Sequence, residues 1–212
     1  MNVELRAYRK EDFKELENII RKTWHYDDLC GPKTAEKLAK VFLSSCLTNY
    51  TFSKVAVLDG QVEGIILVKN IAKHHCPLRD RLFWLRAVVS LFCSKEGRQV
   101  SKVFGSVEGI DKQLLKEKGT SYPAELALFA VSENCRGKGI GKILYQSALE
   151  YMQEEGLDCF YLFTDTSCNY GFYEHQGMKR QAEKSHTFEI RGQKATMNFF
   201  IYDGKSSSEV LQ

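Results

Sequence analysis

The sequence predicts an α/β fold made as one domain over residues 1–212. Strand-like and amphipathic helical segments follow one another along the chain. One nearly unbroken apolar run, residues 125–131, passes through a glycine-rich turn directly into a helix. A chain of 212 residues is long enough to bury one substantial core.

The N-terminal part predicts a strand followed by two helices. Residues 3–9 alternate between apolar and polar side chains, as in a strand. Residues 11–24 place their apolar side chains on one side of a helix. A loop ending in Gly-Pro precedes a second helix over residues 34–48, which Thr34 can cap.

A hairpin is expected next. Two strand-like segments, residues 52–58 and 61–69, flank the dipeptide Asp59-Gly60. Asp-Gly is a strong signal for a two-residue hairpin turn, because both positions tolerate a positive φ. This part of the sheet is therefore expected to be antiparallel.

The most informative stretch runs from Glu125 to Gly141. Its strand is followed by Arg136-Gly137-Lys138-Gly139-Ile140-Gly141, and apolar residues then recur at helical spacing up to Gly156. The first N–H groups of a helix have no internal partner, so this turn suits a phosphate. For the glycines alone, tight packing of the strand on the helix is the better explanation. The P-loop and dinucleotide motifs are excluded by their missing residues.

The pattern that matches is Arg/Gln-x-x-Gly-x-Gly, carried by Arg136, Gly139 and Gly141. A further strand over residues 159–164 is followed by Asn169-Tyr170-Gly171-Phe172-Tyr173, with Gly177 downstream. The two ordered motifs resemble the acetyl-CoA site of the GNAT acetyltransferase superfamily. The resemblance is strong from residue 125 to about 178 and covers the N-terminal part in outline.

The resemblance implies a GNAT-like α/β (α+β) fold with helices flanking a mixed, mostly antiparallel central sheet. In that fold the strands over residues 125–131 and 159–164 splay apart, and acetyl-CoA enters the gap as a co-substrate. The residues expected to bind it are Phe129, Ala130, Val131, Arg136, Gly137, Lys138, Gly139, Ile140, Gly141, Lys142, Asn169 and Tyr173. Among these, the Phe129 N–H is the candidate for holding the thioester oxygen, and the next two residues for holding the pantetheine amides.

The resemblance also implies two catalytic residues. Tyr173 matches the general acid that protonates the coenzyme sulfur, although a tyrosine there could simply pack the short helix. Glu125 stands where some family members use a carboxylate as base, acting on the amine through water. A glutamate paired with a lysine or with solvent is the alternative for that position.

Residues 72–122 form an insertion relative to the basic pattern of the family. Residues 81–93 predict an apolar helix that docks on the domain or on a partner, and residues 109–118 a more polar helix. The insertion is either a lid on the acceptor side or structural packing. Because it starts after the hairpin, it is expected to emerge beside Glu125. The tail, about residues 203–212, is expected to be mobile.

The expected function is transfer of an acetyl group from acetyl-CoA to a primary amine by direct attack. A non-catalytic acyl-CoA-binding or sensor module, and transfer of a different acyl group, are the alternatives. The acceptor is a small molecule or a protein amine. Tyr26, Asp27 and Asp28 lie where the family often contacts it, and a polar loop explains them equally well.

Composition limits the other partners. A net charge of +3 gives no reason to expect nucleic acid, and no apolar run approaches the ~20 residues of a membrane span. No membrane partner is therefore expected, while a homodimer stays open. Seven scattered cysteines without a CxxC pair favour reduced thiols and a cytoplasmic location. His74-His75-Cys76 lacks a second pair of ligands, so no metal is expected.

Overall fold

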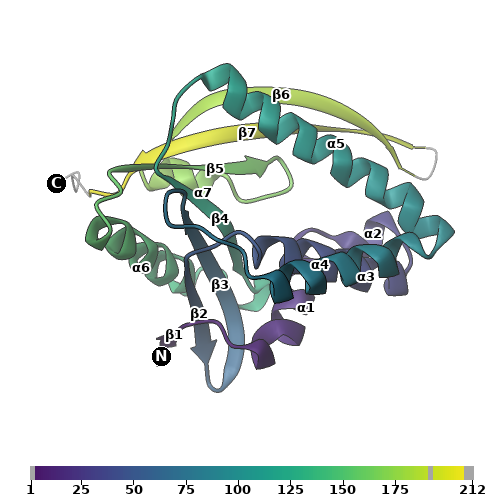
Figure 1. The fold of residues 1–212 in the computed structure, drawn as a ribbon, viewed down its shortest axis with the longest axis horizontal. Helices are drawn as coiled ribbons and strands as arrows, with labels where there is room; N and C mark the ends of the chain where they lie inside the picture. The colour runs from purple at the N-terminus through teal and green to yellow at the C-terminus, as the bar shows by residue number, and fades with distance from the viewer. Residues whose placement is uncertain (1–2, 191–192, 208–212) are drawn as a thin grey trace.

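A computed structural model describes residues 3–190 and 193–207, and one twisted sheet runs through this part of the chain (Figure 1). The strand order is β1-β2-β3-β4-β5-β7-β6, and every neighbouring pair is antiparallel except β4 and β5. The strands are β1 (Val3–Arg6), β2 (Phe52–Leu58), β3 (Gln61–Asn70), β4 (Ala124–Val131), β5 (Cys159–Asp165), β6 (Lys179–Ile190) and β7 (Gln193–Lys205). The mixed, mostly antiparallel sheet expected from the sequence is confirmed.

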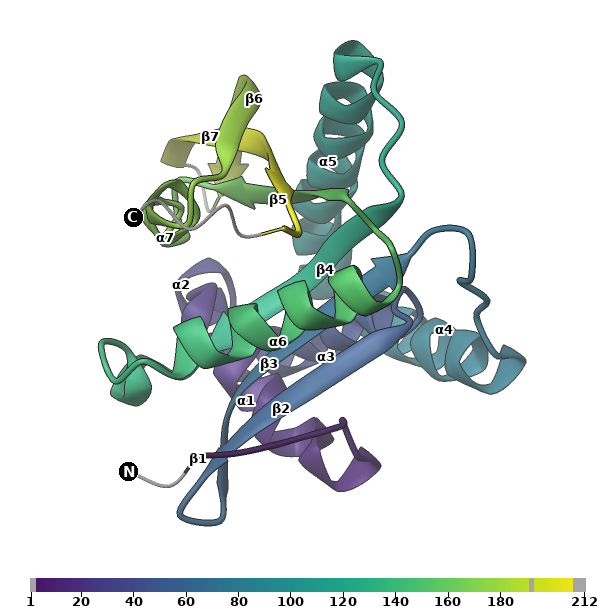
Figure 2. The same ribbon diagram turned by 90° about the vertical axis from the view of Figure 1, so that its left-hand side faces the viewer.

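Helices cover both faces of this sheet (Figure 2). They are α1 (Phe13–Thr23), α2 (Tyr26–Leu29), α3 (Pro32–Cys46), α4 (Leu78–Phe92), α5 (Lys95–Lys118), α6 (Ile140–Glu154) and α7 (Gly171–His175). Alternate side chains of β3 point into opposite layers. Ile66 packs in a cluster with Leu144 of α6, whereas Ile65 packs in another with Leu16 and Leu38 of α1 and α3.

The sheet opens between its two parallel strands. β4 pairs with β5 at Ala124 and Glu125, opposite Phe160 and Tyr161, and the ladder ends there. Both strands continue past this point, β4 along β3 and β5 along β7. The register of β4 against β3 shifts by one residue at Ala127, and such bulges bend a strand. The splay expected from the family resemblance is therefore present.

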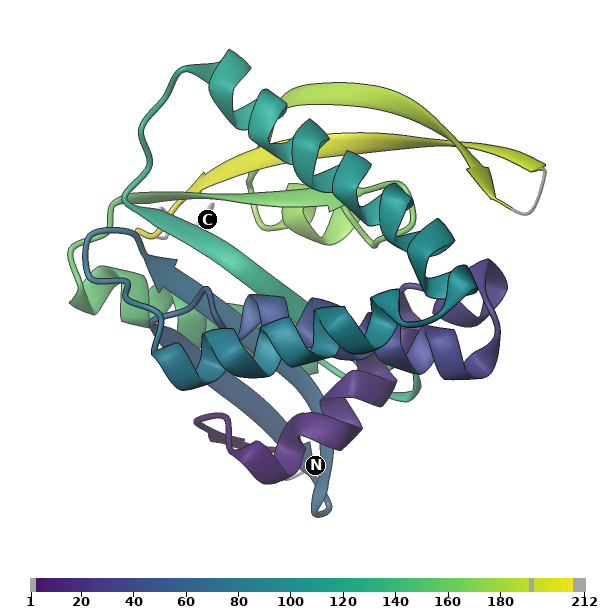
Figure 3. The ribbon, with the colours of Figure 1, turned by 45° about the vertical axis from the view of Figure 1, so that its right-hand side comes forward.

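The insertion leaves and rejoins the sheet at the same end of two neighbouring strands, β3 and β4. Asn70, the last residue of β3, is the register partner of Ala124, the first of β4. Within the insertion, α4 packs on α3 through Leu91, and α5 crosses the β6–β7 hairpin (Figure 3). Leu114 of α5 is fully buried there, in a cluster with Phe199 of β7. Packing is thus one role of α5, which begins well before the expected residue 109.

Two boundaries differ from those expected. Helix α3 begins at Pro32 with Gly31 as its N-cap, and the Thr34 hydroxyl instead donates a hydrogen bond to Glu96. The chain also stays ordered past residue 203, where a mobile tail was expected to start. Residues 203–205 complete β7, and the N–H of buried Ser206 donates to the Asp158 carbonyl at 3.1 Å. Residues 208–212 lie outside the described residues.

Candidate active site

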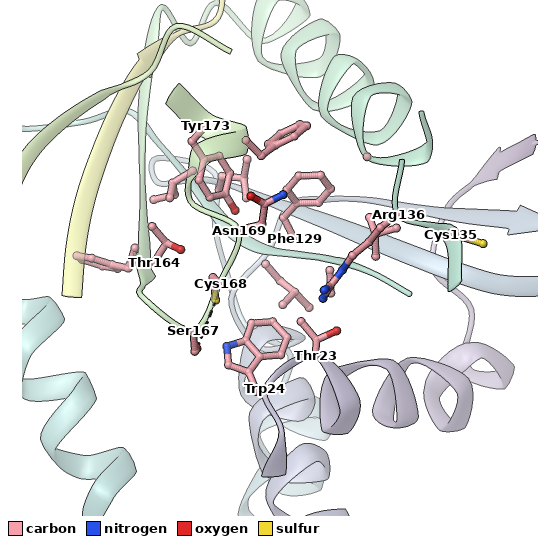
Figure 4. Close-up of a pocket in the computed structure, with 18 of the residues that line it drawn as sticks. Thr23, Trp24, Phe129, Cys135, Arg136, Thr164, Ser167, Cys168, Asn169 and Tyr173 are labelled. Carbon is pink, nitrogen blue, oxygen red and sulfur yellow. Dashed lines mark hydrogen bonds between the residues drawn. The ribbon is translucent and has the colours of Figure 1, made fainter. Parts of the chain in front are cut away.

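A cavity of about 390 Å³ fills the opening between β4 and β5. The start of α6, helix α7 and the end of α1 close its sides (Figure 4). Figure 4 shows Thr23 and Trp24, from the end of α1, facing the loop that carries Ser167 and Cys168. Arg136 extends into the same space from the turn before α6. The cavity is the place where the chain can hold a ligand between two strands.

The backbone of β4 offers unpaired groups to this cavity. The N–H of Ser132 donates to the Glu63 carbonyl on the β3 side at 2.8 Å. Backbone groups of successive strand residues point to opposite edges, so Ala130 also faces β3. Phe129 and Val131 then face the open side, where β5 has moved away. This alternation favours Phe129 and Val131 over Ala130 as backbone partners for a ligand.

The turn before α6 presents a row of free N–H groups. Gly137 and Gly139 have φ of 76° and 82°, which glycine adopts without the strain other residues meet. The first backbone bond inside the helix is Ile143 N–H to the Gly139 carbonyl, so the N–H groups of residues 140–142 precede the ladder. Lys142 and Arg136 stand exposed beside them, and both line the cavity. Together these groups fit a phosphate.

One side chain of the lining lacks a partner. The Oγ1 atom of Thr23 is buried and has no hydrogen bond within the described residues. A buried hydroxyl without a partner is costly, and a polar group of a ligand would satisfy it. Acetyl-CoA, the co-substrate expected from the sequence, carries a pyrophosphate and two amides. The free N–H groups, the basic side chains and this hydroxyl fit those groups.

Tyr173 lies on α7 at the edge of the cavity. Its ring centroid is 6.4 Å from that of Phe129 and 5.7 Å from that of Phe172. Its hydroxyl has no hydrogen bond to any other described residue. Burial raises the pKa of Tyr173 above its ordinary value, so the side chain keeps its proton at neutral pH. A protonated phenol beside the cavity is able to act as an acid.

Glu125 lies where β4 and β5 separate. Its carboxylate accepts a hydrogen bond from Asn49 Nδ2 at 3.3 Å, and Lys69 Nζ lies 4.0 Å away. Tyr161 is its register partner on β5, and burial followed by the charge of Glu125 raises the pKa of that tyrosine. The glutamate thus has the lysine neighbour that a structural role requires, and it also stands at the closed end of the strand opening.

The insertion adds a carboxyl group to this region. Burial raises the pKa of Asp111, on α5, to about 7, with further contributions from Asp165, Glu125 and Glu108. A buried carboxylate among others of like charge holds its proton more tightly. No ion pair of Asp111 occurs within the described parts of the chain. Asp111 therefore brings a carboxyl group with a raised pKa into the neighbourhood of Asp165 and Glu125.

The two cysteines of the lining are poor nucleophiles. Burial raises the pKa of Cys168 to about 11, and burial also raises the pKa of Cys135. A thiol with a raised pKa is neutral at pH 7, whereas the thiolate is the reactive form.

The structure brings most of the expected coenzyme-binding residues to one cavity. Those that line it are Phe129, Ala130, Val131, Arg136, Gly137, Gly139, Gly141, Lys142, Asn169 and Tyr173. Ile140 is instead fully buried in the core, and the amine of Lys138 lies 4.0 Å from Cys135 Sγ. Within the described residues, no group of three or more His, Cys, Asp and Glu side chains could hold a metal ion.

The expected acceptor-binding residues lie beside the cavity rather than in its lining. Tyr26 is buried, and burial raises its pKa well above the ordinary value. Asp27 forms a two-pronged ion pair with Arg21 at the surface, and Asp28 is exposed.

Sequence reasoning missed four groups of this region. Thr23 and Trp24, just before the expected residues, line the cavity together with Thr164, while Asp111 supplies a carboxyl group from the insertion. Trp24 ends the apolar pattern of the first helix, and a tryptophan at a helix end is a weak signal that could have singled it out. The other three are brought in by tertiary packing and carry no local signal.

Comparison with known proteins agrees with this geometry. The model of the acetyltransferase (GNAT) family matches residues 14–178. No curated protein matches the chain significantly. In the described part of the chain, no helix has the length and apolar character needed to cross a bilayer.

Several solved structures share the fold. The chain is similar to smu.2055 from Streptococcus mutans UA159, at 15% identity over 96% of this chain and 99% of that chain, with a TM-score of 0.57. It is similar to an N-acetyltransferase from Staphylococcus aureus Mu50, at 13% identity over 98% and 100%, with a TM-score of 0.55. It is also similar to the ribosomal-protein-S18-alanine N-acetyltransferase from Escherichia coli, at 10% identity over 100% and 99%, with a TM-score of 0.53. Identities this low show the fold alone, whereas the family match covers most of the chain: the protein belongs to the acetyltransferase (GNAT) family and is an acyltransferase.

Proposed function

We propose that the protein transfers an acetyl group from acetyl-CoA to a primary amine by direct attack in a ternary complex. The observation that carries the proposal is the opening between β4 and β5. It turns the N–H of Phe129 toward a cavity that also holds Tyr173 and the start of α6. An acyl acceptor, a thioester and a proton donor can therefore meet in one place.

The coenzyme would lie along β4. The N–H groups of residues 140–142, with Arg136 and Lys142, hold the pyrophosphate. The backbone groups of Val131 hold a pantetheine amide, and Asn169 lies on the opposite wall. In this placement the thioester oxygen receives the N–H of Phe129, which stabilises the negative charge that develops there.

The reaction then needs two proton movements. The neutral amine attacks the thioester carbon, a C–N bond forms, and the C–S bond breaks as the tetrahedral intermediate collapses. Tyr173 gives its proton to the departing sulfur, because the raised pKa of the phenol keeps it protonated until the thiolate forms. Glu125 takes the proton of the amine. Because Glu125 lies four residues, about 13 Å, along β4 from Phe129, this transfer passes through water.

Direct attack is favoured over a covalent acetyl-cysteine. The thiols of Cys168 and Cys135 have raised pKa values, so neither is a thiolate at neutral pH. The Glu125 carboxylate, where β4 and β5 separate, suits an acceptor that arrives as a cation and loses a proton before it reacts.

A panel of amines with detection of free coenzyme A tests the proposal. The panel contains a polyamine, an amine drug and peptides with a free N-terminus or lysine. At least one acceptor should release the thiol, and double-reciprocal plots at varied acetyl-CoA should intersect, as expected for a ternary complex. Acetyl-CoA binding without release by any acceptor would favour the acyl-CoA-binding module, and parallel plots would indicate a covalent acetyl-enzyme. Propionyl- and succinyl-CoA in the same assay show whether another acyl group is preferred.

A further inference from the structure

Helix α4 has two apolar faces, and only one of them is covered. Ala87 and Leu91 are buried against the domain. The opposite face is a stripe whose members are separated by steps of four, three, four and three residues, which places them in one line along the helix. Its members, between 47% and 76% exposed, are Leu78, Leu82, Leu85, Val89 and Phe92. Helix α4, which carries this apolar stripe, lies at the outer edge of the molecule (Figure 2).

Arginines flank the apolar stripe on both sides. At about 100° per residue, Arg81 falls on one side of it and Arg79 and Arg86 fall on the other. All three are exposed. Within the described chain, neither Arg81 nor Arg86 forms an ion pair. The guanidinium groups of Arg81 and Arg86 are thus available to an anionic partner.

Positive charge is concentrated in this part of the chain. Residues 73–98 contain six Lys and Arg and two acidic residues, while the whole chain carries a net charge of only +3. Both acidic residues are engaged within the protein. Asp80 lies 3.6 Å from Arg79, and Glu96 accepts a hydrogen bond from the Gly31 N–H at 2.9 Å. The remainder of the chain is therefore close to neutral, and the charge favours an anionic surface at α4.

A second copy of the chain fits this face poorly. Two apolar stripes packed together would bring the flanking arginines of one helix against those of the other, and like charges there oppose pairing. A helix of 15 residues is about 22 Å long, so its face offers roughly 200 Å², well below the roughly 800 Å² per partner of a stable interface.

We propose that α4 docks the protein in the plane of an anionic lipid bilayer. The apolar stripe enters the boundary between headgroups and acyl chains, and the flanking arginines contact lipid phosphates. Trp84, 37% exposed, follows Arg81 around the helix, and in this orientation it would reach the headgroup level that tryptophan favours in membranes. A helix lying flat needs no membrane-spanning length, so this proposal goes beyond the expectation from the sequence, which considered only runs long enough to cross a bilayer.

Sedimentation of the intact protein with lipid vesicles tests the proposal. The protein should bind vesicles of phosphatidylcholine with about one third phosphatidylglycerol, and bind pure phosphatidylcholine roughly 10-fold less. Leu82→Gln/Leu85→Gln/Val89→Gln removes the apolar contact at exposed positions and should lower binding to the anionic vesicles by about 10-fold or more. Arg81→Gln/Arg86→Gln should do the same through charge. Lys22→Gln/Lys116→Gln, at exposed sites on α1 and α5, changes net charge equally and should bind as the parent does.

A fluorescence measurement locates the contact. Lipids brominated on their acyl chains should quench tryptophan emission on binding, and Trp84→Phe should abolish the quenching although Trp24 remains. Failure to bind anionic vesicles overturns the proposal, as does binding that the α4 variants leave unchanged. A dimer in light scattering that the triple glutamine variant dissolves would assign the face to a second copy instead. Binding of an acidic amphipathic peptide without binding of vesicles would assign it to a protein partner.

Discussion

The rings of Tyr173 and Phe129 lie 6.4 Å apart, one on α7 and the other on β4, on opposite sides of the opening in the sheet. This pair places a proton donor beside the backbone N–H proposed to hold the thioester oxygen. Replacing Tyr173 by phenylalanine keeps the ring packing and removes only the hydroxyl.

We expect Tyr173→Phe to lower kcat about 100-fold while the Kd for acetyl-CoA, measured by calorimetry, stays the same. Tyr170→Phe, in the residue before α7, is the matched control and should keep kcat near that of the parent. A kcat of Tyr173→Phe within two-fold of the parent would mean that the sulfur takes its proton from elsewhere.

A second prediction concerns the turn before α6. Gly139→Glu puts a side chain and a negative charge where the phosphate is proposed to bind. Affinity for acetyl-CoA should fall by at least ~2 kcal/mol, the scale of lost charge-assisted hydrogen bonds. Gly156→Glu, at the other end of the same helix, has a similar positive φ and equally open space, so it carries the same backbone strain. Equal affinity loss in the two variants would show that strain, and not the site, is responsible.

Glu125→Gln separates a catalytic from a structural glutamate. The amide keeps the shape and the contact with Asn49 but cannot take a proton. We expect kcat to fall at neutral pH and to recover as rising pH supplies the free amine without help from the enzyme. A pH–rate profile checks this, with thermal unfolding as a control for the fold. An equal loss at every pH would assign Glu125 to the ion pair with Lys69.

Asp111 should make stability depend on pH. Below about pH 4 its carboxyl is protonated in the folded and the unfolded chain, so it has no effect. Between about pH 4 and its raised pKa of about 7, only the folded chain keeps the proton, so the free energy of unfolding falls as the pH rises, and the loss persists above pH 7.

Asp111→Asn should therefore unfold at a higher temperature than the parent at about pH 8, by about 2–4 °C for each kcal/mol recovered, and at the same temperature near pH 4. Glu117→Gln, at an exposed site on α5 that does not contribute to the raised pKa of Asp111, is the control and should leave the pH dependence unchanged. A difference between Asp111→Asn and the parent that is constant from pH 4 to pH 8 would contradict the raised pKa.

The sequence predicted those parts of the fold that have a local pattern. Strand β4, the turn and α6 follow from an apolar run, three glycines and a helical repeat that are adjacent in the chain. The hairpin β2–β3 follows from Asp59-Gly60, and Asp59 indeed has a φ of 51°. Each of these elements is specified within about twenty residues, and local chemistry is sufficient for them.

The parts that were missed depend on distant contacts. Helix α5 contains Gly97, Gly105 and Gly109, which disfavour a helix, and burial of Leu114 against the β6–β7 hairpin outweighs them. A Cβ at Gly97 would lie 2.0 Å from the Leu91 carbonyl, so that glycine permits the close turn from α4. The β6–β7 hairpin was not predicted from the sequence. Because β7 pairs with β5, residue 203 belongs to a strand and not to the expected mobile tail.

The residues of the candidate site also fall into those that a local motif predicts and those that only tertiary packing brings in. Arg136, Gly139 and Asn169 belong to motifs and were found, but Thr23 and Asp111 reach the region through the packing of α1 and α5. The exposed stripe of α4 shows a related difficulty. A pattern of apolar residues predicts a helix, but it does not say which face another element will cover.

The two ends of the insertion are neighbours: Asn70 faces Ala124 in the sheet, and the Ile71 N–H donates to the Pro123 carbonyl at 3.0 Å. For the pairing of β3 with β4, the whole insertion is therefore equivalent to a single loop. The entropy cost of closing a loop rises by only about 0.6 kcal/mol for each doubling of its length. A lineage can lengthen, exchange or shed such a segment by a single genetic event without disturbing the register of β3 and β4. The insertion can therefore change while the residues that act on the thioester stay the same. Related proteins with the same chemistry can in this way acquire different surface contacts.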